Sequence, residues 1–135
     1  MLLRSLVRKK IRKSLIEASG DPSWVSDEVV DGYTAGAARD LDGTLKAFVG
    51  MARARERERL RPHLAQVACP VLLLLGGAPH TGGPPPAEVT LLAQSLPAFT
   101  ADTVAGAGSF LHEEQPGAVV AAVRRVTPST ASTAP

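Results

Sequence analysis

Cysteine is almost missing from this sequence: Cys69 is the only one, so no disulfide can form within the chain. Because disulfides are typical of oxidising compartments, a single cysteine favours a reducing one, and we expect a cytoplasmic protein. Cys69 precedes Pro70 and an apolar run, which predicts a small core residue rather than a nucleophile. Aromatic residues make up 4% of the chain, so we expect an aliphatic core.

Long apolar runs are missing as well. The longest covers residues 71–75, whereas a membrane-spanning helix needs about 20 apolar residues. The basic residues near the N-terminus are not followed by the apolar core of a secretory signal. The formal net charge of +2 is too small to favour nucleic acid as a partner. We therefore expect neither a membrane nor a nucleic-acid partner.

What the sequence does contain is typical of one modest globular domain: 135 residues, 44% of them apolar and 21% charged. Helical spacing dominates the first part. The first expected helix ends at residues 20–22, and its apolar positions are Leu3, Leu6, Val7, Ile11, Leu15 and Ile16. Its basic face could lie on an anionic membrane, but we favour burial of the apolar stripe against the protein body.

Two further helices are expected before the pattern changes. Ser26 is a suitable N-cap for a second helix of about two turns, ending near Tyr33. Either Asp40 or Asp42 caps a third helix, whose apolar face consists of Leu41, Leu45, Phe48, Val49 and Ala52. The run 53–61 alternates arginine with glutamate, which favours a solvated surface over a nucleic-acid patch.

From about residue 66 the pattern is that of alternating strands and helices. Residues 71–75 form a continuous apolar run, which predicts a strand buried on both faces of a parallel sheet. A glycine- and proline-rich loop, a helix around 89–96, a second strand over 99–104 and a helix over 117–126 follow. This order predicts a right-handed crossover between two adjacent parallel strands. Residues 127–135 consist of serine, threonine, alanine and proline, and we expect a disordered tail.

Several motifs in this region resemble those of the α/β-hydrolase superfamily. They are Cys69-Pro70-Val71, Gly76-Gly77, Pro85 with Glu88, Ser95-Leu96-Pro97, and the run from Gly106 through Ser109-Phe110-Leu111-His112-Glu113-Glu114 to Pro116. The resemblance implies the C-terminal part of that α/β fold, in which a helical cap segment precedes two parallel strands with flanking helices. It also implies three segments: a cap-like segment over 1–65, the closing part of the core over 66–126, and the tail. The activity implied is hydrolysis of a small ester, epoxide or similar substrate.

The chain departs from this family at each catalytic position. No Gly-x-Ser-x-Gly elbow, on which the family carries its nucleophile, occurs in the sequence. His80 stands where the family often has its acid, and Ser109 stands where it has its catalytic histidine. A hydroxyl cannot act as the base near neutral pH, so we expect no catalysis by the chain alone. The implied partners are an N-terminal hydrolase half or a second copy, with a small apolar substrate bound after complementation; the alternative is a non-catalytic association module.

The residues singled out as pocket candidates are His80, Ser109, Phe110 and His112. A replacement pair of Ser109 and His112, and a metal shared by His80 and His112, are both conceivable, but the histidines lack a matching carboxylate or cysteine motif. We therefore expect polar loop residues, without metal or cofactor. Trp24 is expected to pack between cap helices rather than contact a substrate.

Overall fold

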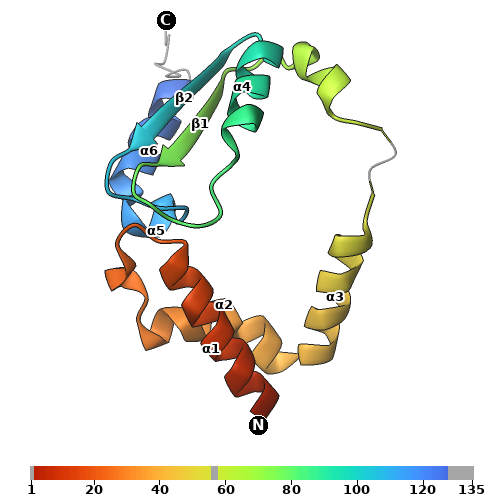
Figure 1. Ribbon diagram of the computed structural model, residues 1–135, viewed down its shortest axis with the longest axis vertical. Coiled ribbons are helices and arrows are strands. Elements are labelled where there is room, and N and C mark those ends of the chain that lie inside the picture. Colours follow the sequence, from red (N-terminus) through yellow and green to blue (C-terminus); the bar gives the residue numbers. More distant parts are fainter. Residues whose placement is uncertain (1, 56–57, 128–135) are drawn as a thin grey trace, which may run out of the picture.

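The computed structural model describes residues 2–55 and 58–127 and is a mixed α/β structure (Figure 1). Its elements are α1 (Leu2–Glu17), the 3-10 helix η1 (Pro22–Trp24), α2 (Asp27–Arg39), α3 (Leu41–Arg53), the 3-10 helix η2 (Arg61–Gln66), β1 (Val71–Gly76), α4 (Pro86–Ser95), β2 (Phe99–Val104), α5 (Leu111–Glu114) and α6 (Pro116–Val126). The predicted disordered tail lies, apart from Thr127, outside the described residues.

The sheet consists of β1 and β2, which pair in parallel with Val71 opposite Phe99 and Gly76 opposite Val104. The prediction of two adjacent parallel strands is confirmed. Helix α4, which connects them, packs on β2, and α6 packs on β1. In Figure 1 the strands run between these two helices. An ion pair of 2.7 Å between Asp102 of β2 and Arg125 of α6 fastens the last helix to the sheet.

The helices begin where their capping residues predict. The Ser26 hydroxyl accepts a hydrogen bond from the Val29 amide at the start of α2. Asp40, rather than Asp42, caps α3 by accepting from the Gly43 amide. The expectation that the second helix ends near Tyr33 is wrong, since α2 continues to Arg39. Three of the six residues that follow Tyr33 in α2 are alanine, which gives no apolar periodicity but has the highest helix propensity.

Helices α1 and α2 pack together around an aliphatic core, as the low aromatic content predicts. Leu15, Val25 and Val30 are buried, and Val30 is completely so. The predicted burial of the first helix holds only in part: Leu15 is buried, whereas Leu6 is 56% exposed. Ile16 is also exposed, so the apolar stripe is not continuously covered.

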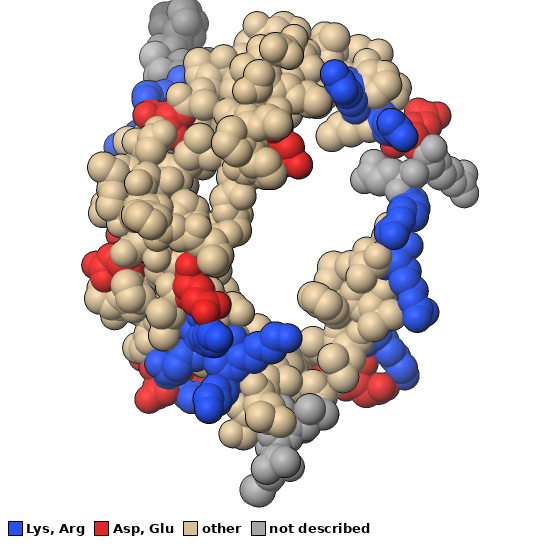
Figure 2. All heavy atoms as spheres, viewed as in Figure 1, with Lys and Arg blue, Asp and Glu red and all other residues tan. Residues whose placement is uncertain are grey.

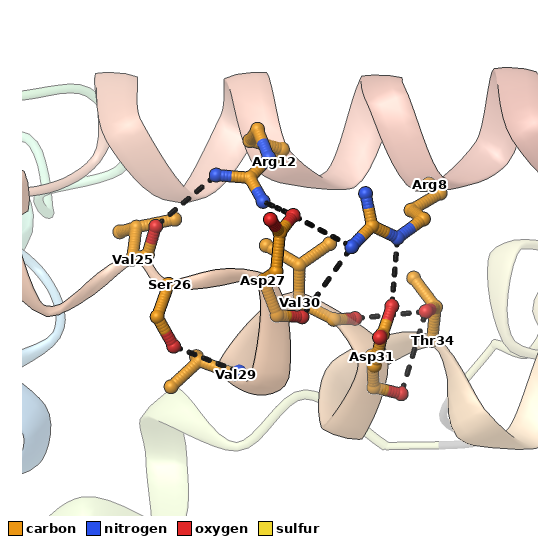
Figure 3. Close-up of polar contacts among 9 residues, drawn as sticks. All are labelled: Arg8, Arg12, Val25, Ser26, Asp27, Val29, Val30, Asp31 and Thr34. Atoms are coloured by element: carbon orange, nitrogen blue, oxygen red, sulfur yellow. Dashed lines mark hydrogen bonds and ion pairs between the residues drawn. The ribbon is translucent and has the colours of Figure 1, made fainter.

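Charged residues join the two helices beside this core (Figure 3). Arg8 donates to Asp31 at 2.7 Å and to Asp27 at 2.8 Å, and Arg12 donates to Asp27 and to the Val25 carbonyl. Hydrogen bonding to the two aspartates raises the pKa of Arg8, and the contacts with Arg8 and Arg12 lower the pKa of Asp27. These pairs hold the start of α2 against the middle of α1.

Helix α3 extends away from this pair and borders an opening in the molecule (Figure 2). Its predicted apolar face is largely uncovered: Leu45 is 49%, Phe48 67% and Val49 42% exposed. Lysine and arginine lie mainly along the outer side of this arm in Figure 2, whereas its inner side is free of charge. The helix is therefore amphipathic in its sequence pattern, but the described residues leave most of its apolar face uncovered.

Two expectations about burial near β1 are wrong. Every residue of β1 is only partly buried, although its sequence predicts burial on both faces. Cys69, expected in the core, is exposed. The reason is the size of the sheet, because in the described part of the chain no strand lies beside β1 opposite β2.

Candidate functional site

Three chain segments meet where the two strands end: the C-terminal end of α1, the loop after β1 and the turn after β2. We call this place the junction. The Ser109 amide donates to the Ala18 carbonyl at 2.7 Å, and the Thr81 amide donates to the Glu17 carbonyl at 3.0 Å. The last carbonyls of a helix have no partner inside the helix, so these bonds both satisfy them and attach α1 to the end of the sheet.

Glycines allow the segments of the junction to approach closely. A Cβ atom on Gly108 would lie 2.4 Å from the Ala18 carbonyl oxygen, and one on Gly20 would lie 2.4 Å from that of Gly106. A Cβ on Gly76 would lie 2.2 Å from the Gly108 oxygen. Because all three obstacles are backbone atoms, any side chain would force the segments apart. The three glycines therefore have a packing role here.

Glu114 closes the junction from the side of α5. Its carboxylate accepts hydrogen bonds from the amides of Gly20 at 2.7 Å, Asp21 at 2.9 Å and Gly108 at 2.9 Å. One side chain thus binds the turn after α1 and the turn after β2 together. The sequence pattern does not reveal this role of Glu114, because its partners are backbone amides and two of them, those of Gly20 and Asp21, are distant in sequence.

His80 and Ser109, two of the pocket candidates, line one hollow of about 300 Å³ beside the junction. Leucines from β1 and α5 and several glycines complete its wall. His80 Nδ1 lies 2.6 Å from the Ala78 carbonyl oxygen. A carbonyl only accepts, so Nδ1 is the donor in this contact, and in the neutral ring Nε2 is then an acceptor. The hollow therefore offers one imidazole acceptor above an apolar wall.

Ser109 is held by backbone groups on both of its polar sides. Its amide is bound to Ala18, and its hydroxyl donates to the Thr81 carbonyl at 3.0 Å. A nucleophilic serine would instead donate to a base. The contacts of Ser109 are those of a residue that positions two loops.

Phe110 and His112 lie elsewhere. Phe110 packs against Trp24, with ring centroids 5.3 Å apart, and meets Tyr33 edge-on at 6.1 Å. Trp24 also donates from its indole nitrogen to the Ser19 hydroxyl at 3.1 Å. The prediction that Trp24 packs is confirmed, but Phe110, which follows β2, forms part of its environment. This aromatic cluster is a second contact between the first helices and the turn after β2.

His112 lies beside the exposed Tyr33. The Tyr33 hydroxyl donates to Glu113 at 3.0 Å and lies 3.5 Å from His112 Nε2. Partial burial of the phenol raises the pKa of Tyr33 above its ordinary value of 10.0, and the contact with Glu113 raises it further. The conceivable hydrogen bond from Ser109 to His112 does not form, since the Ser109 hydroxyl donates to the Thr81 carbonyl. Within residues 2–55 and 58–127, no three His, Cys, Asp or Glu side chains gather into a group that could hold a metal ion.

No family model matches the chain, and no curated protein matches it. Across the described residues, none of the helices combines the length and the apolar character needed to cross a membrane.

Proposed function

We propose that this chain supplies the cap segment and the closing strands of an α/β-hydrolase-type assembly, and that it acts by association with the part that carries the remaining strands. By itself it has no hydrolase activity. The assembly would act on a small ester, epoxide or similar substrate. The proposal rests on one observation: β1 has the sequence of an interior strand but lies at the edge of the sheet in the described structure.

The sequence of β1 suits an interior position in a sheet, whereas the sequence of β2 suits an edge. β1 reads Val-Leu-Leu-Leu-Leu-Gly, which is the pattern of an interior strand in a parallel sheet. β2 reads Phe-Thr-Ala-Asp-Thr-Val and has polar residues, as an edge strand facing water does. Both strands lie at an edge in the described structure. The edge beside β1 is therefore the one where a further strand is expected.

Backbone hydrogen bonds identify the groups that this further strand would bind. The amides of Val71 and Gly77 donate to carbonyls of the β2 segment at 2.8 and 2.9 Å. Successive amides in a strand point to opposite edges, so those of Leu73 and Leu75 also point to β2. The amides and carbonyls of Leu72 and Leu74 face the other edge. The apolar face of α3 offers a second surface to the same partner across the opening.

The contacts of Ser109 support the absence of catalysis by the chain alone. In an assay with a general ester such as 4-nitrophenyl acetate, the purified chain is expected to give no turnover above buffer. Ser109→Ala would then change nothing. Saturable hydrolysis that Ser109→Ala abolishes would contradict the proposal.

A complementation experiment tests the association itself. The chain would be mixed with the N-terminal half of an α/β-hydrolase that carries an intact nucleophile elbow, and complex formation would be followed by size-exclusion chromatography with light scattering. Leu73→Lys, which places a charge on the sheet face, is expected to prevent the complex. Thr100→Lys on β2 is the matched control and is expected to be tolerated. A chain that remains monomeric with every such half, and shows no self-association, would contradict the proposal.

The second candidate is a pseudo-hydrolase that only associates, favoured by the backbone contacts that occupy Ser109. The two candidates differ in what Ser109→His does in the complex. General-base catalysis contributes about 10²–10⁴ in rate. In a hydrolase assembly, Ser109→His together with His80→Asp would raise esterase activity by an amount in this range. An unchanged rate would favour the purely associating module.

A further inference from the structure

A groove between α1 and α2 lies at the opposite end of α1 from the junction, and we call it the α1–α2 groove. Its volume is about 310 Å³, and it extends from the first turns of α1 to Leu41 at the start of α3. Pockets for small ligands begin at about 300 Å³. None of the pocket candidates His80, Ser109, Phe110 and His112 lines it. The groove is thus separate from the site described above.

The groove exists because the two helices are held together at only one end. Arg8 and Arg12 fix the start of α2 against the middle of α1. Further along, α2 presents Ala37 and Ala38, whose short side chains do not fill the space towards α1. Together with Val7 and Leu41 they give the groove an apolar floor.

Three charged side chains line the groove: Arg8 and Asp31 are paired with each other, whereas Arg4 forms no ion pair with a described residue. The guanidinium of Arg8 is bound by Asp27 and Asp31, so the acidic side chain on the wall is already neutralised. Arg4 lies one helical turn earlier on α1 and also lines the groove. No described carboxylate forms an ion pair with it, and the hydroxyl of Ser5, next to it, makes no hydrogen bond with a described residue. The mouth of the groove therefore carries one positive charge and one free hydroxyl above an apolar floor.

We propose that the α1–α2 groove binds a small amphipathic carboxylate, with its apolar chain on Val7, Ala37, Ala38 and Leu41 and its carboxylate on Arg4. A planar guanidinium binds a carboxylate through two parallel hydrogen bonds, which makes arginine well suited to this role. Ser5 supplies a further donor. A cationic amphiphile is excluded by Arg4, and a neutral one forfeits the charge-assisted bonds.

Decanoate, used below the concentration at which it forms micelles, is a suitable probe. Isothermal titration calorimetry on the full chain is expected to show saturable binding with one site. Arg4→Gln is expected to weaken binding at least tenfold. Lys10→Gln removes the same charge from an exposed position of the same helix outside the groove, and it is expected to bind as the unmodified chain does.

A second set of measurements distinguishes the contribution of the apolar floor from that of the bond between Arg4 and the carboxylate. Ala37→Leu fills the floor and is expected to abolish binding, with circular dichroism to verify that the helices are intact. If this variant does not fold, the Arg4→Gln and Lys10→Gln pair still decides the question. Decanol, which has the same chain without the charge, is expected to bind at least tenfold more weakly than decanoate.

Four results would overturn the proposal. These are a lack of saturable decanoate binding, equal weakening by Arg4→Gln and Lys10→Gln, unchanged binding by a folded Ala37→Leu variant, and equal affinity for decanol. Co-sedimentation with vesicles of phosphatidylglycerol and phosphatidylcholine tests the other source of an amphipathic anion. Vesicle binding that both charge variants reduce equally, without decanoate binding, would assign the affinity to the basic surface of α1 and would also overturn the proposal.

Discussion

The junction differs from the surfaces of β1 and α3 in how completely its contacts are made within the described chain. At the junction, backbone segments lie closer than a Cβ atom would permit, and Glu114 binds three amides there. By contrast, the leucines of β1 are only partly buried, and the apolar face of α3 is largely uncovered. The difference shows which contacts the described chain completes by itself and which apolar surfaces it leaves uncovered. Hydrogen bonds attach the end of α1 to the end of the sheet, whereas β1 has no neighbouring strand opposite β2 among the described residues.

The largest expected effect comes from a side chain at the centre of the junction. Gly108→Ala places a Cβ 2.4 Å from the Ala18 oxygen and 2.5 Å from the Gly20 nitrogen. Since both are backbone atoms, we expect a loss of about 3 kcal/mol in the free energy of unfolding. Gly36→Ala in α2 is the control, because, apart from its chain neighbours and the nearby backbone of its own helix, nothing lies within 4 Å of its Cβ position. It should stabilise the chain by roughly 0.5–1 kcal/mol. Urea unfolding followed by circular dichroism measures both, and equal effects would contradict the assigned close packing.

A smaller loss is expected when the side chain that closes the junction is altered. Glu114→Gln keeps the shape but replaces a carboxylate that accepts from three amides. We expect a loss of about 2 kcal/mol, because hydrogen bonds to charged groups are the stronger ones and an amide group left unpaired is costly. Glu113→Gln makes the same change at a carboxylate that contacts the exposed side chains of Tyr33 and His112, and it should cost clearly less. Should the two variants unfold at the same urea concentration, Glu114 would have no special role.

The aliphatic core and the α3 face can be compared directly. Val30→Ala truncates a completely buried side chain and should cost about 2 kcal/mol. Phe48→Ser removes a larger side chain that is 67% exposed, so the isolated chain should change by no more than about 0.5 kcal/mol. The same Phe48→Ser variant should weaken association with the complementary half. A large loss of stability of the isolated chain would show that α3 is covered in solution.

The smallest effect concerns the pairs between α1 and α2. Arg8 and Arg12 lower the pKa of Asp27 in the folded chain below its ordinary value of 3.8, so the stabilisation is present above this pH and is lost as the pH falls below it. We expect a modest fall in melting temperature between neutral pH and pH 3. The Asp27→Asn variant should show a smaller fall in melting temperature over the same pH range. The part of the fall that is due to the Asp102–Arg125 pair should remain, because this pair lowers the pKa of Asp102. An identical pH dependence in both chains would mean that the pairs do not persist in solution.

The elements with strong local patterns could be predicted from the sequence. Ser26 identifies the start of α2, and the bounds of β2 agree with the apolar and polar pattern of residues 99–104. The end of α2 and the short α5 could not be predicted, because alanine-rich and four-residue helices have little periodicity. At the site, the prediction brought His80 and Ser109 to one place, and both line one hollow. It grouped Phe110 and His112 with them, but their positions depend on aromatic contacts with Trp24 and Tyr33 that no local pattern encodes.

The burial of β1 shows a different limit. A continuous apolar run predicts the environment for which a strand is suited, and this holds whether or not the other strands are present. Its exposure in the described structure reflects the size of the sheet rather than an error in the pattern. The same reasoning applies to α3, whose apolar periodicity is clear while its cover is absent from the described residues. In both cases the pattern suits a buried position, whereas the described structure leaves the surface at least partly uncovered.

Amide hydrogen exchange within β1, measured by NMR on the isolated chain at a concentration where it is monomeric, tests the central claim most directly. The amides of Leu73 and Leu75 point to β2 and are expected to exchange slowly. Those of Leu72 and Leu74 point to the open edge and are expected to exchange rapidly, becoming protected when the complementary half is added. If all four amides of the monomer were equally protected, the edge of β1 would already be covered, and the account of this chain as an incomplete sheet would be contradicted.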